Sequence, residues 1–219
     1  DWIGVCVKGK AGRAPPMAPA SFAVKLESGV ATGEVGFTNK GDVPLVTGIY
    51  DKAFMTEMTK ATALIYAGLR WDDAQGVQLC EALRHAHAHG GLRELKALYL
   101  SANKLGDGFV TALVALLDEG GLANVETLGL SVNAISDAGM RELAAAVARG
   151  GLPKCTTLYL DGNPGSDAPV KEALAQPNPL RMHEATELDY FKRGWDDAAG
   201  VELCEALHHA HTHGGLREL

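Results

Sequence analysis

The segment LYLSANKLGDGFVTALVALLDEGG, residues 98–121, decides the fold of this chain because two further segments align with it without gaps. They are LGLSVNAISDAGMRELAAAVARGG, residues 128–151, and LYLDGNPGSDAPVKEALA, residues 158–175. Each contains the pattern L-x-L-x-x-N, with asparagines at Asn103, Asn133 and Asn163, and successive copies start 30 residues apart. A period of this length predicts a structure built from stacked repeats.

A longer duplication overlies these repeats. Residues 70–95 and 194–219 are identical at 21 of 26 positions, and the relation extends upstream to Leu64 and Leu188. If these leucines also begin L-x-L strands, strand starts fall near residues 64, 98, 128, 158 and 188. The unit that carries Trp71 is then four residues longer than its neighbours. We expect its histidine-rich stretch EALRHAHAHGG, residues 81–91, to lie in a lengthened helix.

Each unit has the pattern of one strand followed by one helix. Both leucines of L-x-L point to the same side, because side chains alternate along a strand. Met140, Leu143 and Val147 recur at helical spacing, which predicts an amphipathic helix packed on that side. One unit leaves an apolar face uncovered, so the units are expected to stack into a solenoid. The asparagine amide is expected to hydrogen-bond backbone groups that the turn after the strand leaves unpaired.

The L-x-L-x-x-N pattern and the unit length of about 30 residues resemble the leucine-rich repeat, in particular its ribonuclease-inhibitor-like subclass. The resemblance covers residues 64–219. It implies a right-handed α/β solenoid, with a parallel sheet on the concave side and helices on the convex side, and protein–protein binding as the usual role. Leu69 and Arg193 stand where two of the asparagines are expected, so we expect the row of asparagines to be interrupted there.

The first fifty residues contain no repeat. GKAGRAPPMAPAS, residues 9–21, has the composition of a linker or extended arm. Phe22, Val24 and Leu26 alternate, and residues 32–50 resemble short strands around a turn at residues 39–42. We therefore predict a small β-rich segment, or alternatively an extended arm along another protein, over residues 1–50. A capping helix is predicted over residues 51–63.

The last two units differ from the others. Pro177 and Pro179 are expected to shorten the helix of the fourth unit. The fifth unit stops at Leu219, before its next strand, and a solenoid end of this kind lacks a polar cap. We expect further chain or another protein to cover this end.

Composition narrows the functional classes. The net charge is −7 and the pI is near 5.6, which argues against a nucleic-acid-binding surface. The longest apolar runs are too short for a transmembrane segment. Cys6, Cys80, Cys155 and Cys204 are scattered without a CxxC pair, which favours an intracellular, reducing compartment. A cytoplasmic and an organellar location are both open alternatives.

The histidine-rich stretch raises the question of metal binding. His85 and His89 are spaced i, i+4, which lets two imidazoles share one ion, and their copies are His209 and His213. No further ligand stands at metal spacing nearby. Helical geometry directs Cys80 inward, whereas His85 and His89 face outward. No metal site is therefore favoured, and the four histidines are lower-ranked candidates.

The concave side offers the candidate partner-binding residues. The middle residues of the five L-x-L strands are Ile65, Tyr99, Gly129, Tyr159 and Asp189, and the next positions on that side are Ala67, Ser101, Ser131, Asp161 and Phe191. The predicted contact residues among them are Tyr99, Ser101, Ser131, Tyr159, Asp161 and Phe191. Tyrosines often dominate binding energy, and the gap at Gly129 between two of them is expected to admit a partner's side chain.

Other conspicuous residues have structural explanations. Trp71 and its copy Trp195 are predicted to fill the core of the longer units. The pair Asp72-Asp73 that follows Trp71 is predicted to cap a helix N-terminus.

No catalytic motif is present, because the chain lacks a phosphate-binding loop, a GxSxG and an HExxH sequence. The sequence favours a non-enzymatic interaction or scaffold protein without a cofactor. It would bind another protein or a multi-subunit complex, as an accessory or linker subunit, through the concave face and the N-terminal arm. The alternatives are a metal-binding module that uses the histidine pairs and a solenoid that activates GTPases.

Overall fold

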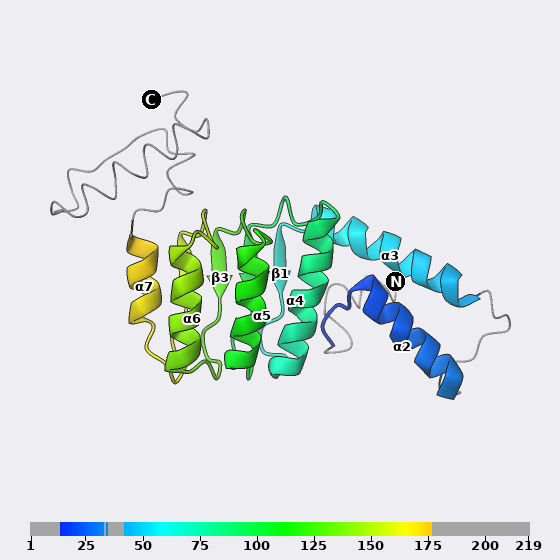
Figure 1. The fold of residues 1–219 in the computed structure, drawn as a ribbon, viewed down its shortest axis with the longest axis horizontal. Coiled ribbons are helices and arrows are strands. Elements are labelled where there is room, and N and C mark those ends of the chain that lie inside the picture. Colours follow the sequence, from blue (N-terminus) through cyan, green and yellow to red (C-terminus); the bar gives the residue numbers. More distant parts are fainter. Residues whose placement is uncertain (1–13, 33, 35–41, 177–219) are drawn as a thin grey trace, which may run out of the picture.

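The computed structural model describes residues 14–32, 34 and 42–176, and within them it is an α/β structure in which strands and helices alternate (Figure 1). In chain order the elements are α2 (Pro19–Thr32), α3 (Asp42–Lys60), β1 (Ala63–Ile65), α4 (Asp73–Ala88), β2 (Ala97–Tyr99), α5 (Asp107–Asp118), β3 (Thr127–Gly129), α6 (Asp137–Ala148), β4 (Thr157–Tyr159) and α7 (Ala168–Ala175).

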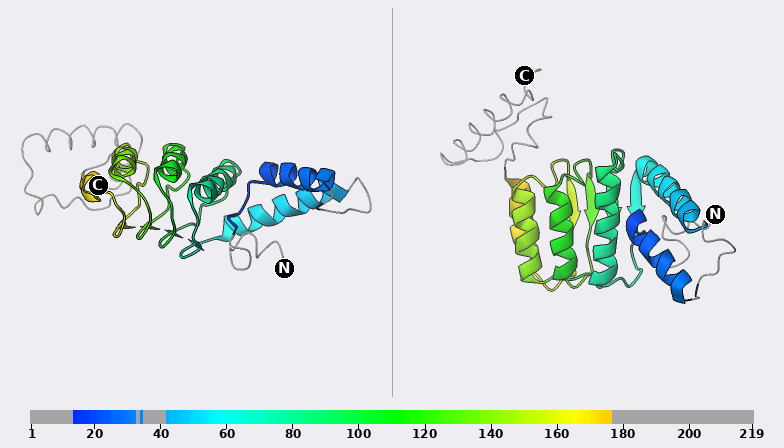
Figure 2. Two further views of the ribbon diagram at one scale, coloured as in Figure 1. Left: turned by 90° about the horizontal axis from the view of Figure 1, so that it is seen from below. Right: turned by 45° about the vertical axis from the view of Figure 1, so that its right-hand side comes forward.

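The four strands form one parallel sheet in the order β1-β2-β3-β4. The first leucines of successive L-x-L motifs are paired in register, Leu64 with Leu98, Leu98 with Leu128 and Leu128 with Leu158. Helices α4 to α7 lie side by side along one side of this sheet (Figure 2). The result is a solenoid-like stack of strand–helix units, and the in-register repeat predicted from the sequence is confirmed over residues 63–175.

Unit length also follows the prediction. Helix α4 has 16 residues, whereas α5 and α6 have 12 each, so the unit that carries Trp71 has the lengthened helix. Helix α7 has only 8 residues. The residue after it, Gln176, has extended backbone angles, as expected for the position before Pro177.

The core lies between the sheet and these helices. Met140, Leu143 and Val147 on α6 are inaccessible to solvent, as their spacing predicts. Trp71 is 2% exposed and stacks on Tyr66 with 5.0 Å between ring centroids, which confirms that this indole fills the core of its unit.

The asparagines satisfy backbone groups at the turns, as predicted, but each serves two consecutive units. Asn103 Nδ2 donates to the carbonyl oxygens of Tyr66 and Leu100, and its Oδ1 accepts from Leu69 N and Trp71 N. Leu69 therefore does not interrupt the row at its own turn, because the asparagine of the following unit caps that turn. Asn133 and Asn163 repeat this arrangement one and two units further on.

A series of aspartates links the starts of successive helices. Each aspartate accepts from the following unit, whereas each asparagine side chain bonds back to the preceding one. Asp72 caps α4 in a capping box, as predicted, but Asp73 does not cap its own helix. Its carboxylate accepts from Gly106 N and Gly108 N at the start of the next unit. Asp107 in turn accepts from Ser136 N at 2.9 Å. The prediction of an N-cap was wrong for Asp73. The backbone N–H groups that donate to its carboxylate lie in the neighbouring repeat and not in the first turn of its own helix.

The N-terminal segment is helical rather than β-rich or extended over its described residues. The alternation of Phe22, Val24 and Leu26 falls within α2, where Phe22 stacks on Tyr50 of α3 with 4.0 Å between ring centroids and Val24 is 66% exposed. The Tyr50 hydroxyl donates to the Met17 carbonyl oxygen. The prediction was wrong because this segment is stabilised by packing of one helix on another. The alternating burial expected for a strand does not occur.

The capping helix is longer than predicted. Helix α3 starts at Asp42 rather than at residue 51 and ends at Lys60, so residue 63 already belongs to β1. Phe54 and Met58 are fully buried against the first repeat, in agreement with the predicted apolar face. Helices α2 and α3 form a hairpin that extends beyond the β1 end of the repeats (Figures 1 and 2). The strand predicted at 188 and the second histidine tract lie outside the described residues.

Candidate interaction surface

Three rows of side chains cross the four strands on the side of the sheet turned away from α4–α7, which we call the strand face. The middle row consists of Ile65, Tyr99, Gly129 and Tyr159, which the strand register places side by side. Because alternate residues of a strand share a side, one flanking row is Ala63, Ala97, Thr127, Thr157. The other is Ala67, Ser101, Ser131, Asp161, just past the strand ends, where backbone hydrogen bonds continue from unit to unit. The strand face thus brings together five predicted contact residues, whereas Phe191 lies outside the described residues.

The gap expected at Gly129 is filled from within the chain. Gly129 is buried, and a Cβ atom there would lie 3.2 Å from Tyr99 Cδ1 and 3.1 Å from Ser101 Oγ. The Tyr99 ring therefore leans over the glycine, and its side chain is only partly exposed. Glycine at this position admits the neighbouring tyrosine rather than a partner's side chain.

Large exposed apolar groups of this region stand at the two ends of the middle row and in one neighbouring turn. Ile65 on β1 is 65% exposed and Tyr159 on β4 is 48% exposed. Val132, in the turn after β3, is 58% exposed and has a left-handed backbone with φ of 56°. Ile65 was placed in the row from the sequence but was not among the predicted contact residues. Val132 was not predicted, because it lies in the turn before Asn133, outside the alternation of the strand.

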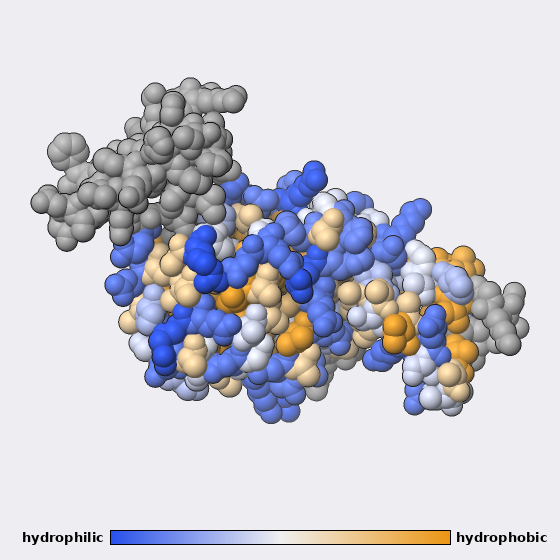
Figure 3. All heavy atoms as spheres, viewed as in Figure 1, coloured by the Kyte–Doolittle hydropathy of each residue, from blue (hydrophilic) through white to orange (hydrophobic). Residues whose placement is uncertain are grey.

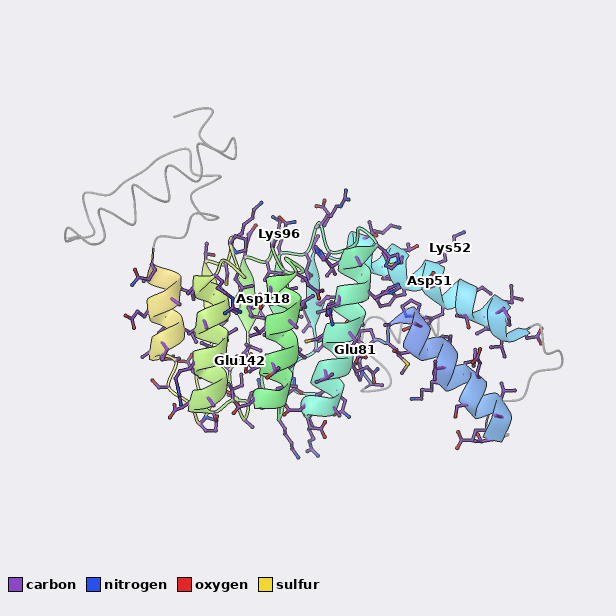
Figure 4. The ribbon with its side chains drawn as sticks, in the orientation of Figure 1. Asp51, Lys52, Glu81, Lys96, Asp118 and Glu142 are labelled. Carbon is purple, nitrogen blue, oxygen red and sulfur yellow. The ribbon has the colours of Figure 1, made fainter. Side chains whose placement is uncertain are left out.

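Charge is distributed unequally between the two sides of the repeats. Of the residues in the three strand-face rows, only Asp161 carries a formal charge. The helix side, in contrast, carries ion pairs between neighbouring helices, Arg84 with Glu119 and Arg149 with Asp118. Figure 3 shows hydrophilic residues spread over this side, and Figure 4 shows charged side chains such as Asp118 and Glu142 projecting from it.

The hairpin carries a separate apolar surface. Val24 on α2 and Leu45 and Ile49 on α3 are 66%, 62% and 51% exposed, and hydrophobic residues are visible at that end of the molecule in Figure 3.

The histidines of α4 occupy three different environments. His87 Nε2 lies 3.0 Å from the Glu119 carbonyl oxygen, and exposed His89 donates from Nδ1 to the His85 carbonyl oxygen. His85 was predicted to face outward, but its side chain is only 23% exposed. The difference arises because α3 packs against α4 and places Asp51 and Phe54 over this position, a contact that the predicted capping helix did not specify.

The geometry of the His85–His89 pair does not favour metal chelation. The two rings stack with 4.2 Å between centroids and 28° between planes, so their in-plane nitrogen lone pairs do not converge on one point. Within residues 14–32, 34 and 42–176, no group of three or more His, Cys, Asp and Glu side chains is arranged to hold a metal ion. His209 and His213 lie outside these ranges.

The described cysteines are buried thiols. Cys80 faces the core, as predicted, and burial raises the pKa of its thiol to about 12. Cys155 is 7% exposed and donates from Sγ to the Thr157 carbonyl oxygen. Neither thiol has the solvent access that a reactive cysteine requires.

None of the helices in the described ranges combines the length and the apolar character that a membrane span requires. Comparison of the sequence with protein-family models and with curated proteins finds no match.

Proposed function

We propose that this chain is a non-enzymatic protein-interaction module of the leucine-rich-repeat type, which binds another protein through its strand face. The observation that carries the proposal is the middle row, in which Ile65, Tyr99 and Tyr159 lie in register on a face with a single formal charge. A face that exposes large apolar groups and few charges loses little on desolvation, and aromatic side chains contribute strongly to binding energy.

The chemistry of the strand face favours a particular kind of partner. Apolar groups at both ends of the row and hydroxyl groups of serine and threonine beside it suit an uncharged, partly apolar segment of a protein. Asp161, exposed beside Tyr159, favours a cationic group at the β4 end of that segment. The exposed apolar residues of the α2–α3 hairpin support a second contact, as expected for an accessory or linker subunit of a larger assembly.

The test is a quantitative binding measurement with the partner that copurifies from the natural source. We expect Tyr159→Ala to weaken binding by about 10-fold or more, because alanine removes an exposed ring from the middle row. Tyr99→Ala is expected to weaken it as well, since its ring both contacts the partner and covers Gly129.

Arg149→Ala is the matched control, because it removes a large exposed side chain from the helix side. It should leave the dissociation constant within about twofold of the wild-type value. Equal affinities for Tyr159→Ala and the wild type, with both folded, would contradict binding through the strand face.

A further inference from the structure

His85 lies where the α2–α3 hairpin meets the repeats. Phe54 of α3 packs edge-on against its ring with 5.9 Å between ring centroids, and Asp51 Oδ1 of α3 lies 3.7 Å from His85 Nε2. On α4, the ring of His89 stacks on the His85 ring. Figure 4 shows Asp51 on α3 beside α4. The imidazole is therefore enclosed by groups from both helices.

The Nε2 atom of His85 is unsatisfied in this arrangement. It is buried and makes no hydrogen bond, and the 3.7 Å to Asp51 Oδ1 is too long for one. An unpaired buried polar atom destabilises the packing around it. A proton at this atom would add a positive charge to an enclosed site beside the apolar ring of Phe54, where a charge is poorly solvated.

We propose that protonation of His85 loosens the contact between α3 and α4, so that in mildly acidic conditions the α2–α3 hairpin opens away from the repeats more often. The hinge is the C-terminal end of α3. There the backbone leads directly into β1, and Leu92 N donates to the Met58 carbonyl oxygen. Other described links are a hydrogen bond from Gln78 Nε2 to the Pro15 carbonyl oxygen and the apolar contacts of Phe54 and Met58, which are buried against the first repeat. Protonation of His85 therefore shifts the balance between docked and open hairpin and does not release the hairpin outright.

The charged groups that face His85 are consistent with opening of the hairpin on protonation. On α3 the facing charge is Asp51, whose side chain is 52% exposed, so solvent screens its attraction for an imidazolium. On α4, His89 opposes a second positive charge at stacking distance, and Glu81, one turn earlier, is exposed to solvent. The docked arrangement therefore suits a neutral imidazole better than a charged one.

The linkage to pH follows from the same contacts. Burial, and next the neighbouring His89, lower the pKa of His85 below its ordinary value of 6.5, and Asp51 opposes this only in part. Once the hairpin has swung away, the imidazole regains its ordinary pKa and binds a proton more readily than in the docked state. The advantage of the docked state is thus complete above pH 6.5 and declines as the pH falls below that value.

The experiment is backbone hydrogen exchange of the whole chain at pH 7.5 and pH 5.5, with labelling times scaled for the intrinsic pH dependence of exchange. Helices α5 and α6 provide the internal reference. We expect protection of residues 42–60 to fall about threefold or more at pH 5.5 relative to that reference. Asp51→Asn should enlarge the fall, because it removes the one attractive charge on α3.

His85→Phe is the decisive variant, because it keeps an aromatic ring against Phe54 and cannot be protonated. It should abolish the pH response of residues 42–60, and His85→Gln provides the same test if the phenylalanine variant does not fold. His87→Gln, a histidine change on the same helix away from α3, should retain the wild-type response. A response of equal size in wild type and in the His85 variants, or none in the wild type, would overturn the proposal.

Discussion

The repeats and the α2–α3 hairpin are stabilised in different ways. In the described repeats, equivalent contacts recur from one unit to the next, so paired leucines, asparagines and aspartates return at intervals close to the unit length. The hairpin is held mainly by aromatic contacts among Phe22, Tyr50 and Phe54, which occur once. Repetition makes a contact visible in the sequence, whereas a contact that occurs once leaves no periodic signal.

Substitution of an asparagine in the row Asn103, Asn133 and Asn163 is expected to have the largest effect on stability, and so tests this comparison most directly. We expect Asn133→Leu to destabilise the repeats by about 3 kcal/mol, because the backbone groups of Leu100, Leu105 and Leu130 lose their partner inside the core. Urea unfolding of the whole chain measures the loss of free energy of unfolding.

Asn124→Leu is the matched control. Asn124 makes one exposed hydrogen bond, to the Arg93 carbonyl oxygen, so its substitution should cost less than about 0.5 kcal/mol. If both leucine variants lost the same free energy, the asparagine row would not be the feature that stabilises the turns.

Contacts that recur in the repeats were largely predictable from the sequence, whereas contacts that occur once were not. The strand register and the buried face of α6 were predicted, because neighbouring copies confirm each residue's position. The partner of Asp73 was not, since the sequence shows that an aspartate recurs but not which unit supplies its donors. The hairpin was misassigned because Phe22, Val24 and Leu26 fit a strand pattern locally, and only the distant Tyr50 decides for a helix.

The candidate surface shows the same limit at the level of single side chains. The alternation along each strand predicted that Tyr99, Gly129 and Tyr159 share one side, and the register of the sheet places them there. It did not predict that Tyr99 would cover Gly129, because the direction in which a side chain leans depends on its neighbours in the folded sheet. Likewise, His85 was assigned to solvent because the sequence predicted the helix that carries Asp51 and Phe54 but not that this helix packs over His85.

The aspartate series should show a smaller and pH-dependent effect. Asp107 accepts from the backbone and the hydroxyl of Ser136, and these hydrogen bonds lower the pKa of its carboxyl group below its ordinary value of 3.8. We expect Asp107→Ala to destabilise the repeats by about 1 kcal/mol at pH 7. Because the native pKa is lowered, this contribution is complete above the unfolded-state value and is lost as the pH falls through the native pKa.

Urea unfolding of Asp107→Ala and wild type at pH 7, 5 and 3 tests whether their free energies of unfolding approach each other as the pH falls. Asp118→Ala, which removes an exposed ion pair with Arg149, is the control and should change stability by less than about 0.5 kcal/mol at each pH. A difference between wild type and Asp107→Ala that stayed constant down to pH 3 would show that the carboxylate charge is not what joins the units.

The smallest effect concerns the hairpin alone and has the opposite sign. Gly48 lies within α3, and a Cβ atom there would meet no other atom within 4 Å. We expect Gly48→Ala to stabilise α3 by about 0.5 to 1 kcal/mol, because alanine loses less conformational entropy in a helix than glycine does. Gly120 has equally open surroundings but a φ of 78°, so Gly120→Ala should destabilise the repeats instead. Hydrogen exchange should then show increased protection confined to residues 42–60 in Gly48→Ala, since Gly48 precedes Phe54 and Met58, which pack on the first repeat. Increased protection that spread equally through α5 and α6 would mean that hairpin and repeats unfold as one cooperative unit, and the contrast between them would hold for their contacts but not for their stability.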